Sequence, residues 1–382
     1  MPVYLDNAAT SYPKPEAVYE TVISYMRNLG ASPGRGTYRT ARKAAEIIYE
    51  TRELVARLFN IDDTTRIVFT ANVTESINLV LKGYLKSGDH VVTTRMEHNA
   101  VWRPLKVLEK QRGITISTLE CPGGSTFKID QLDHLVLPAT RLVVINNASN
   151  VTGTLMPVKE VGNYCAEHKI PLLVDAAQTA GVFPIDVQEM KINLLAFTGH
   201  KGLLGPTGTG GLYIAPGIDL EPLKEGGTGG DSLLEHQPDH LPDRYEAGTL
   251  NAAGIAGLGA GVRFILEQGI DKIRSHEMAL TKYALEQLIK IPNLLVYGPK
   301  DANERTAVIS FNFKNIAPEE VTYVLDEVYE IMARSGLHCA PQAHRAIDTI
   351  KGHGTIRVSF GYFNKLEEID LLSRALTDIA SA

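Results

Sequence analysis

A lysine that could act as a reactive amine follows one of the apolar segments of the chain. Lys201 stands three residues after LLAFT (194–198), in the run Thr198-Gly199-His200-Lys201. A lysine close behind a buried strand loses solvation, which lowers its pKa towards the neutral amine that forms Schiff bases. Thr198 and His200 beside it offer hydrogen-bond donors for a phosphate. A solvated loop lysine, the state of most lysines in proteins, is the alternative.

An acidic residue ends a second apolar segment, PLLVD (171–175). Asp175 at the end of a buried strand is unfavourable unless it meets a cation. A pyridinium nitrogen is such a cation, and enzymes that use pyridoxal phosphate (PLP) place an acidic partner against it. Gln178, three residues further on, could hydrogen-bond a neighbouring oxygen of the ring. A helix cap or a strand-end turn would explain Asp175 equally well.

A third candidate lies in ANVTESIN (71–78), where Asn72 is followed three residues later by Glu75. This spacing resembles a capping box, which marks the N-terminus of a helix. The amides of Val73 and Thr74 would then point out of the helix end and form an anion site. A capped helix that binds nothing is the alternative.

Alternating strands and helices must position these residues. Helical patterns at 74–86, 99–112 and 158–169 lie between apolar segments and predict an α/β fold with a mainly parallel sheet. Ligands of such sheets bind beyond the carboxyl ends of the strands, so Lys201 and Asp175 could meet one ligand. Seven short segments rich in Val, Ile and Leu are the predicted strands of this sheet: 66–70, 90–94, 114–118, 141–146, 171–175, 194–198 and 210–215.

We expect two domains, because 382 residues are too many for one simple core. Residues 16–255 form the predicted large domain, which would bind the cofactor. Residues 256–382, together with 1–15, form the predicted smaller α+β domain. The segment 221–249, rich in Gly, Pro and Asp, is typical of a long loop, and 250–290 predicts a long helical stretch.

Composition limits the possible partners. A net charge of −6 gives no general attraction to nucleic acid or to anionic membranes. No apolar run approaches the roughly 20 residues that span a bilayer, and the start of the chain lacks the pattern of a secretory signal. Three widely spaced cysteines, Cys121, Cys165 and Cys339, favour neither a disulfide framework nor a zinc site. A cytoplasmic location is the simplest expectation.

Several segments together resemble the class V aminotransferase superfamily, whose members adopt the PLP-dependent transferase fold type I. They are YLDNAAT (4–10), NVTESIN (72–78), MEHNAV (96–101), NVTGTLMPV (150–158), VDAAQTAG (174–181), TGHKGLLGPTGTGGLY (198–213) and RYEAGTLN (244–251). The resemblance runs essentially end to end. It points to the cysteine desulfurase and selenocysteine lyase branch, especially the type that serves the SUF iron–sulfur pathway. GRGTY (34–38) departs from many SUF-type members, which carry histidines there, so the exact subgroup stays open.

The resemblance implies a set of cofactor contacts. Lys201 would hold PLP as a Schiff base. Asp175 would pair with the pyridine nitrogen, and Gln178 with the ring hydroxyl. The phosphate would be held by a helix start and a strand end: Val73, Thr74, Thr198 and His200.

Three further residues acquire roles through the resemblance. His98, in MEHNAV, would stack on the face of the ring and could shuttle protons; from spacing alone, an ordinary helix-start residue is the alternative. Asn150 matches a position that contacts the substrate carboxylate or a ring oxygen. Thr249 matches a residue that binds the phosphate of the partner subunit, so a homodimer is implied.

Residues 334–339, RSGLHC, resemble the RxGxHC segment of the family, which implies that Cys339 is a nucleophile. Its loop contains Gly, Ser, His and Pro, which suits an exposed thiolate, whereas a small buried residue is the alternative. Arg334 and Arg357 (in GTIRVSF) match arginines that bind the substrate carboxylate, a task suited to a guanidinium. Cys121 and Cys165 lack a comparable setting and are expected to be structural.

The implied activity converts L-cysteine to L-alanine, with sulfur taken up by Cys339 as a persulfide for delivery to an acceptor protein. A selenocysteine lyase, another PLP-dependent C–S lyase and a class V aminotransferase are the alternatives. A PLP-binding protein without turnover is disfavoured, because Lys201, Asp175, His98 and Cys339 are all present. GPTGTGG (205–211) leads into a strand, not a helix, so a dinucleotide site is not expected.

Overall fold

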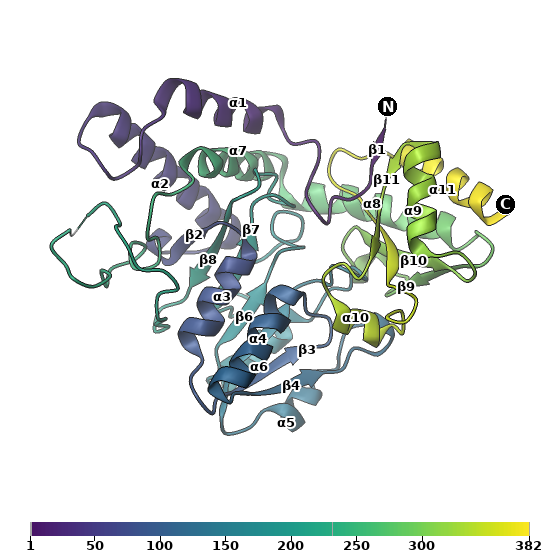
Figure 1. Ribbon diagram of the computed structural model, residues 1–382, viewed down its shortest axis with the longest axis horizontal. Helices are drawn as coiled ribbons and strands as arrows, with labels where there is room; N and C mark the ends of the chain where they lie inside the picture. The colour runs from purple at the N-terminus through teal and green to yellow at the C-terminus, as the bar shows by residue number, and fades with distance from the viewer. Residues whose placement is uncertain (1, 231, 382) are drawn as a thin grey trace.

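A seven-stranded sheet forms the centre of the larger part of the molecule (Figure 1). The computed structural model describes residues 2–230 and 232–381. The strand order is β2-β8-β7-β6-β5-β3-β4, and all neighbours are parallel except the two pairs that involve β8. The prediction of an α/β fold with a mainly parallel sheet is confirmed. The strands are β2 (Ile67–Thr70), β3 (His90–Thr94), β4 (Thr115–Leu119), β5 (Thr140–Asn146), β6 (Leu172–Asp175), β7 (Leu194–Thr198) and β8 (Gly210–Ile214).

Alternate residues of the central strands pack on opposite faces of this sheet. In β5, Val143 and Ile145 belong to one core and Leu142 and Val144 to another. Helices cover both faces, so the strands are apolar throughout. The face of Leu142 is covered by α3 (Val73–Tyr84) and α4 (Asn99–Arg112), and the opposite face by α2 (Arg39–Phe59), α6 (Val158–Glu167) and α7 (Ala252–Gln268).

A second sheet, antiparallel and four-stranded, lies in the C-terminal part of the chain with a core of its own. Its strands, in the order β12-β13-β10-β9, are β9 (Leu294–Tyr297), β10 (Val308–Phe313), β12 (Arg334–Gly336) and β13 (Thr355–Ser359). The helices of this core are α8 (Ile270–Leu288), α9 (Pro318–Tyr329) and α11 (Leu366–Ser381). The remaining elements named here are α1 (Glu16–Ser24), α5 (Gln131–Leu135), α10 (Pro341–Ala346), β1 (Val3–Tyr4) and β11 (Ile331–Met332).

The predicted helical stretch 250–290 is two helices. The chain turns between α7 and α8 at Gly269, whose φ of 83° is accessible to glycine at little cost. The boundary predicted between residues 255 and 256 falls inside α7, whose buried side chains pack with the core of the large sheet. The division into domains stays a prediction, and this packing favours a boundary near Gly269.

The first residues of the chain connect the two sheets. β1 pairs with β11, and the amide of Ala8 donates to Ser359 Oγ of β13 at 2.8 Å. The amide of Ser11 donates to the carbonyl of His200 at 2.9 Å, and Gln178 Nε2 donates to the carbonyl of Ala8 at 3.1 Å. The N-terminal segment therefore fixes the strand ends of the large sheet to the small sheet.

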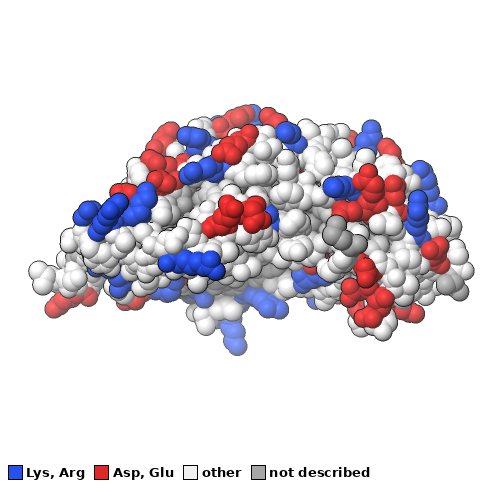
Figure 2. Space-filling view, turned by 90° about the horizontal axis from the view of Figure 1, so that it is seen from above, with Lys and Arg blue, Asp and Glu red and all other residues white. Residues whose placement is uncertain are grey.

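Charged side chains of both signs are interspersed over the face seen in Figure 2. The net charge of the whole chain is −6.

Within residues 2–230 and 232–381, no helix has the length and apolar character needed to cross a lipid bilayer.

A buried ion pair holds the end of the 221–249 loop against α2 and β2, and it yields a stability prediction. Arg52 Nη1 and Nη2 bond Glu246 Oε1 and Oε2 at 2.9 and 3.0 Å, and the amide of Phe69 donates to Oε1 at 2.6 Å. We expect Glu246→Ala to lower the free energy of unfolding by about 3–5 kcal/mol, because Arg52 keeps its charge but loses its partner. The double change Arg52→Met with Glu246→Leu should lower it far less. Urea unfolding measures the difference, and equal losses in the two variants would contradict the prediction.

Candidate active site

A small cavity lies between the carboxyl ends of β5, β6 and β7 and the N-termini of α3 and α4. Parallel strands bring these ends to one edge of the sheet, which is why segments far apart in the sequence meet there. Six of the residues predicted from the sequence line this cavity: Val73, His98, Asn150, Asp175, Gln178 and Lys201.

Lys201 is held in an environment that favours its neutral amine. Its pKa is lowered to about 8, first by burial and then by the charge of Arg357, against the opposing effect of Asp175. A neutral amine is the form that attacks an aldehyde, so Lys201 has the property required of a Schiff-base lysine.

Asp175 ends β6 and is almost fully buried, at 4% exposure. Its Oδ1 accepts a hydrogen bond from the amide of Ala177 at 2.9 Å. Burial raises its pKa, while that hydrogen bond and the charge of Lys201 act in the opposite direction. A carboxylate in this position is best stabilised by a further cation, which a pyridinium nitrogen would supply.

His98 is the N-cap of α4, so the helix-start alternative describes its backbone correctly. Its Nδ1 accepts a hydrogen bond from the amide of Ala100 at 3.0 Å, which leaves the proton of the neutral ring on Nε2. Burial, and then the charge of Lys201, lower its pKa to about 4. The ring that lines the cavity is therefore neutral near pH 7.

One end of the site has the features of an anion cradle. Asn72 Oδ1 accepts from the amide of Glu75 at 3.1 Å and caps α3, whose first-turn amides include those of Val73 and Thr74. Gly210 lets this helix end approach the sheet, since a Cβ there would lie 2.7 Å from Asn72 Cα.

Thr198 is opposite Gly210 in the neighbouring strand. Its Oγ1 and His200 Nδ1 are buried without a hydrogen-bond partner among the described residues. Burial also lowers the pKa of His200 to about 4. Unpaired buried polar atoms beside a helix N-terminus fit a phosphate, and the amine and the carboxylate described above fit the rest of PLP.

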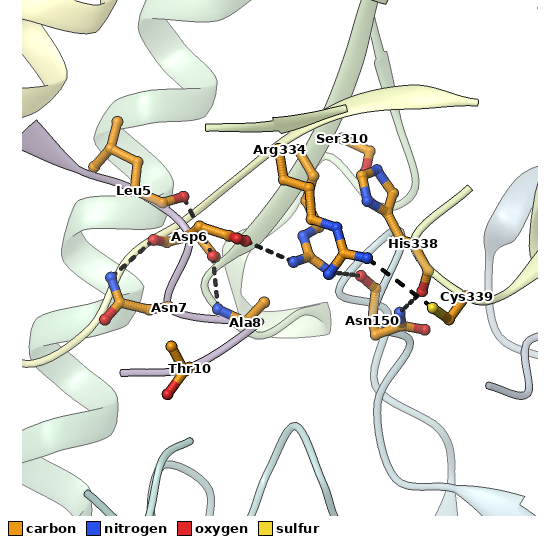
Figure 3. Close-up of polar contacts among 12 residues, drawn as sticks. Leu5, Asp6, Asn7, Ala8, Thr10, Asn150, Ser310, Arg334, His338 and Cys339 are labelled. Atoms are coloured by element: carbon orange, nitrogen blue, oxygen red, sulfur yellow. Dashed lines mark hydrogen bonds and ion pairs between the residues drawn. The ribbon is translucent and has the colours of Figure 1, made fainter. Parts of the chain in front are cut away.

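Cys339 lies in the loop between β12 and α10 and is exposed. The carbonyl of His338 accepts from Asn150 Nδ2 at 2.7 Å, and the carbonyl of Cys339 accepts from the amide of Asn99 at 2.8 Å. His338 and Cys339 have φ values of 46° and 57°, a left-handed conformation that side chains rarely adopt. The start of α4 and the segment after β5 therefore hold the thiol loop, and Asn150, which bonds this loop (Figure 3), also lines the cavity.

The two predicted carboxylate-binding arginines stand opposite each other on neighbouring strands, Arg334 on β12 and Arg357 on β13. Arg334 Nη2 lies 4.0 Å from Cys339 Sγ. Arg357 is buried, with Nη1 bonded to the carbonyl of Asn150 at 3.0 Å and Nη2 to Asp6 Oδ1 at 2.7 Å (Figure 3). The arginines differ, because Arg357 has an anionic partner and Arg334 faces the thiol.

The remaining predicted residues lie away from this cluster. Thr249 is exposed, just before α7, and lines a hollow with Arg35 and Tyr49. Cys121 and Cys165 are buried, and burial raises the pKa of each thiol to about 12. Neither has the exposure of Cys339.

The sequence matches the family model of class-V aminotransferases over residues 3–372. The chain belongs to this family. It is 36% identical to a probable cysteine desulfurase of Methanothermobacter thermautotrophicus, covering 99% of this chain and 94% of that protein. It is 33% identical to a cysteine desulfurase of Salmonella agona, covering 98% of this chain and 93% of that protein.

Solved structures agree with this class V assignment. The apo structure of cysteine desulfurase from Thermococcus onnurineus has a TM-score of 0.94 at 33% identity, covering 100% of this chain and 95% of that chain. The S-sulfonic acid form of the Escherichia coli cysteine desulfurase CsdA has a TM-score of 0.89 at 30% identity, with 100% and 94% covered. The predicted resemblance and fold type are confirmed.

Two residues near this site, Asp6 and Glu97, were not identified from the sequence. Asp6 meets Arg357, which lies 351 positions away. Glu97 is fully buried, and its Oε1 accepts from Thr94 Oγ1 at 2.7 Å and from the amide of Asn146 at 2.9 Å. Both stand inside the segments YLDNAAT and MEHNAV, but nothing in their local spacing indicates such partners.

The lowered pKa of Lys201 predicts how the cofactor-free protein reacts with added PLP. Because only the neutral amine attacks, the rate of covalent uptake should rise with pH and level off above about 8, whereas an ordinary lysine has a pKa of 10.5. Stopped-flow absorbance measures this rate. Asp175→Asn removes a charge that raises the pKa, so its midpoint should move to lower pH. A wild-type midpoint like that of an ordinary lysine would contradict the desolvation of Lys201.

Proposed function

We propose that this protein is a PLP-dependent cysteine desulfurase that converts L-cysteine to L-alanine and takes the sulfur on Cys339 as a persulfide. The position of Cys339 carries the proposal, because this exposed thiol lies in a loop bonded to Asn99 and Asn150 at the Lys201 cavity. Relatives 33–37% identical to the chain and named cysteine desulfurase or probable cysteine desulfurase support the same activity.

The residues of the cavity divide the work on the amino acid. PLP, when bound, supplies an electron sink for the α-carbon of the substrate. Lys201 would hold the cofactor through its amine and would accept the α-proton of the substrate, a task suited to an amine of pKa about 8. Asp175 would lie against the ring nitrogen and favour positive charge there. Asn150 Oδ1, buried without a partner among the described residues, offers an acceptor to the bound molecules.

The sulfur step belongs to Cys339 and Arg334. The Cys339 thiolate forms an S–S bond to the substrate sulfur while the substrate C–S bond breaks. The electron pair of that bond goes to carbon, which takes a proton and leaves as alanine. The carbon is reduced as the sulfur is oxidised, so no further oxidant is needed. The Arg334 guanidinium lies 4.0 Å from Sγ, so a substrate carboxylate held by this arginine would lie close to the thiol.

Replacing Cys339 tests the proposal. Cys339→Ala should keep PLP binding but lower sulfide and alanine formation from cysteine by about two orders of magnitude or more, since the nucleophile is gone. Cys165→Ala, which removes a buried thiol, is the matched control and should retain activity. Mass spectrometry should find the extra sulfur on Cys339 after cysteine treatment under non-reducing conditions. Full activity of Cys339→Ala would overturn the assignment, and turnover of selenocysteine alone would favour the lyase alternative.

We further propose a homodimer in which Thr249 completes the phosphate site of the partner. Large apolar side chains are exposed on and near α1 and α2: Ile23 (48%), Met26 (68%), Tyr38 (58%) and Tyr49 (54%). Tyr49 and Thr249 line the same hollow. An exposed apolar surface of this kind favours burial against a second copy through a twofold axis.

A mixed dimer distinguishes a shared site from a self-contained one. Thr249→Glu should weaken PLP binding because it places a negative charge beside the phosphate, and Lys201→Ala should be inactive. Co-expressed with differently tagged chains, the heterodimer of the two variants should recover about half of the wild-type activity, since one of its two sites is intact. A heterodimer as inactive as its parents would show that Thr249 acts within its own chain.

The persulfide requires a destination, and we propose transfer to an acceptor protein in the cytoplasm, where it would serve iron–sulfur cluster assembly. The exposure of Cys339 supports access by such a partner. The acceptor and the exact subgroup, SUF-type or another, remain predictions of the sequence resemblance.

A further inference from the structure

Arg357 and Arg334 form a like-charged pair at the proposed substrate site. They are in register on adjacent antiparallel strands, so their side chains leave the same face of the small sheet. Ser310 of β10 continues this row and donates to the carbonyl of Val151 at 2.6 Å, so the row faces the large domain. Two guanidiniums placed opposite each other repel and require an anion.

Asp6 is that anion in the structure described here. Its Oδ1 lies 2.7 Å from Arg357 Nη2, and the Asp6 side chain is 21% exposed whereas that of Arg357 is 1% exposed. The backbone fixes the position of Asp6, since the Leu5 amide donates to Met332 and the Leu5 carbonyl accepts from the Ser359 amide at 2.7 Å. The carboxylate is therefore built into the site on the N-terminal segment.

The guanidinium of Arg357 still has capacity for a ligand. It carries five N–H donors, of which Asp6 and the Asn150 carbonyl take one each. Its Nε is buried with no hydrogen-bond partner among the described residues. With Arg334 included, the cluster holds two positive charges and one negative charge, so it has room for one monoanion.

On the basis of the proposed function, we propose that Asp6 sets the affinity of this site for the α-carboxylate of the amino acid. Asp6 and the incoming substrate carboxylate would share the Arg357 guanidinium, and the two negative charges would repel each other. The repulsion weakens binding enough for alanine to leave and be replaced by the next substrate. Asp6 thus sets the affinity for the carboxylate by acting through Arg357. A simple structural counter-ion would differ, because its loss would misplace Arg357 and weaken binding.

The experiment measures binding of L-alanine to the PLP-loaded protein by calorimetry, together with KM and kcat for L-cysteine. Asp6→Asn keeps an oxygen that can accept from Arg357 but removes the charge. We expect it to bind L-alanine about tenfold more tightly and to lower KM and kcat together, because one repulsive unit charge is gone and product leaves more slowly. Asp6→Glu should keep the wild-type values, because the carboxylate is retained. Glu327→Gln, at an exposed position of α9, is the control that removes one negative charge elsewhere in the chain, and it should leave alanine binding unchanged.

Unchanged or weaker L-alanine binding in a folded, PLP-loaded Asp6→Asn variant would overturn the proposal. If that variant does not fold, the unmodified protein supplies the measurement through L-alaninamide, which lacks the carboxylate charge. If L-alanine binds less than about a hundredfold more tightly than L-alaninamide, the result supports a guanidinium shared with Asp6. A much larger ratio of the two dissociation constants overturns the proposal. Alanine binding does not depend on sulfur transfer, so its outcome is independent of whether the desulfurase assignment holds.

Discussion

The site depends on holding two basic side chains, Lys201 and the buried Arg357, in one region although their positive charges repel. The charge of Arg357 contributes to lowering the pKa of Lys201 to about 8, and burial lowers the pKa of Arg357 as well. Asp175 and Asp6 offset this repulsion from opposite sides, one from the end of a large-sheet strand and the other from the N-terminal segment. These charges, together with desolvation, make the Lys201 amine easier to deprotonate than an ordinary lysine while Arg357 keeps its charge nearby.

The need for a negative charge beside Arg357 explains why the N-terminal segment lies between the two sheets. This segment brings Asp6 to Arg357. It also donates a backbone hydrogen bond to the carbonyl of His200 and accepts one from Gln178. Asn150 extends the connection, since its carbonyl accepts from Arg357 while its side chain donates to His338 in the thiol loop. A ligand that moves Arg357 would therefore also move Asn150, and through the Asn150 side chain the loop that carries Cys339.

Much of this arrangement could be predicted, because local physics decides it. Strands buried on both faces are apolar, and the residues that follow them lie at one edge of the sheet, which brought Lys201, Asp175 and Val73 together. Pairing between residues 351 positions apart leaves no local signal, so Asp6 was missed. The antiparallel direction of β8 was missed because an apolar strand has the same sequence pattern in either direction. The turn at Gly269 was missed because the helical pattern continues on both sides of this single glycine.

The start of α4 joins the two halves of the proposed chemistry. His98 accepts the Ala100 amide, which fixes its ring and keeps its proton on Nε2, and the next residue, Asn99, donates its amide to the carbonyl of Cys339. His98 and the loop of Cys339 are thus positioned by consecutive residues of one helix end. With a pKa of about 4, the His98 ring is neutral near pH 7, and its Nε2–H can donate a hydrogen bond. Lys201, whose pKa lies near 8, is the more basic of the two groups and therefore the better proton acceptor.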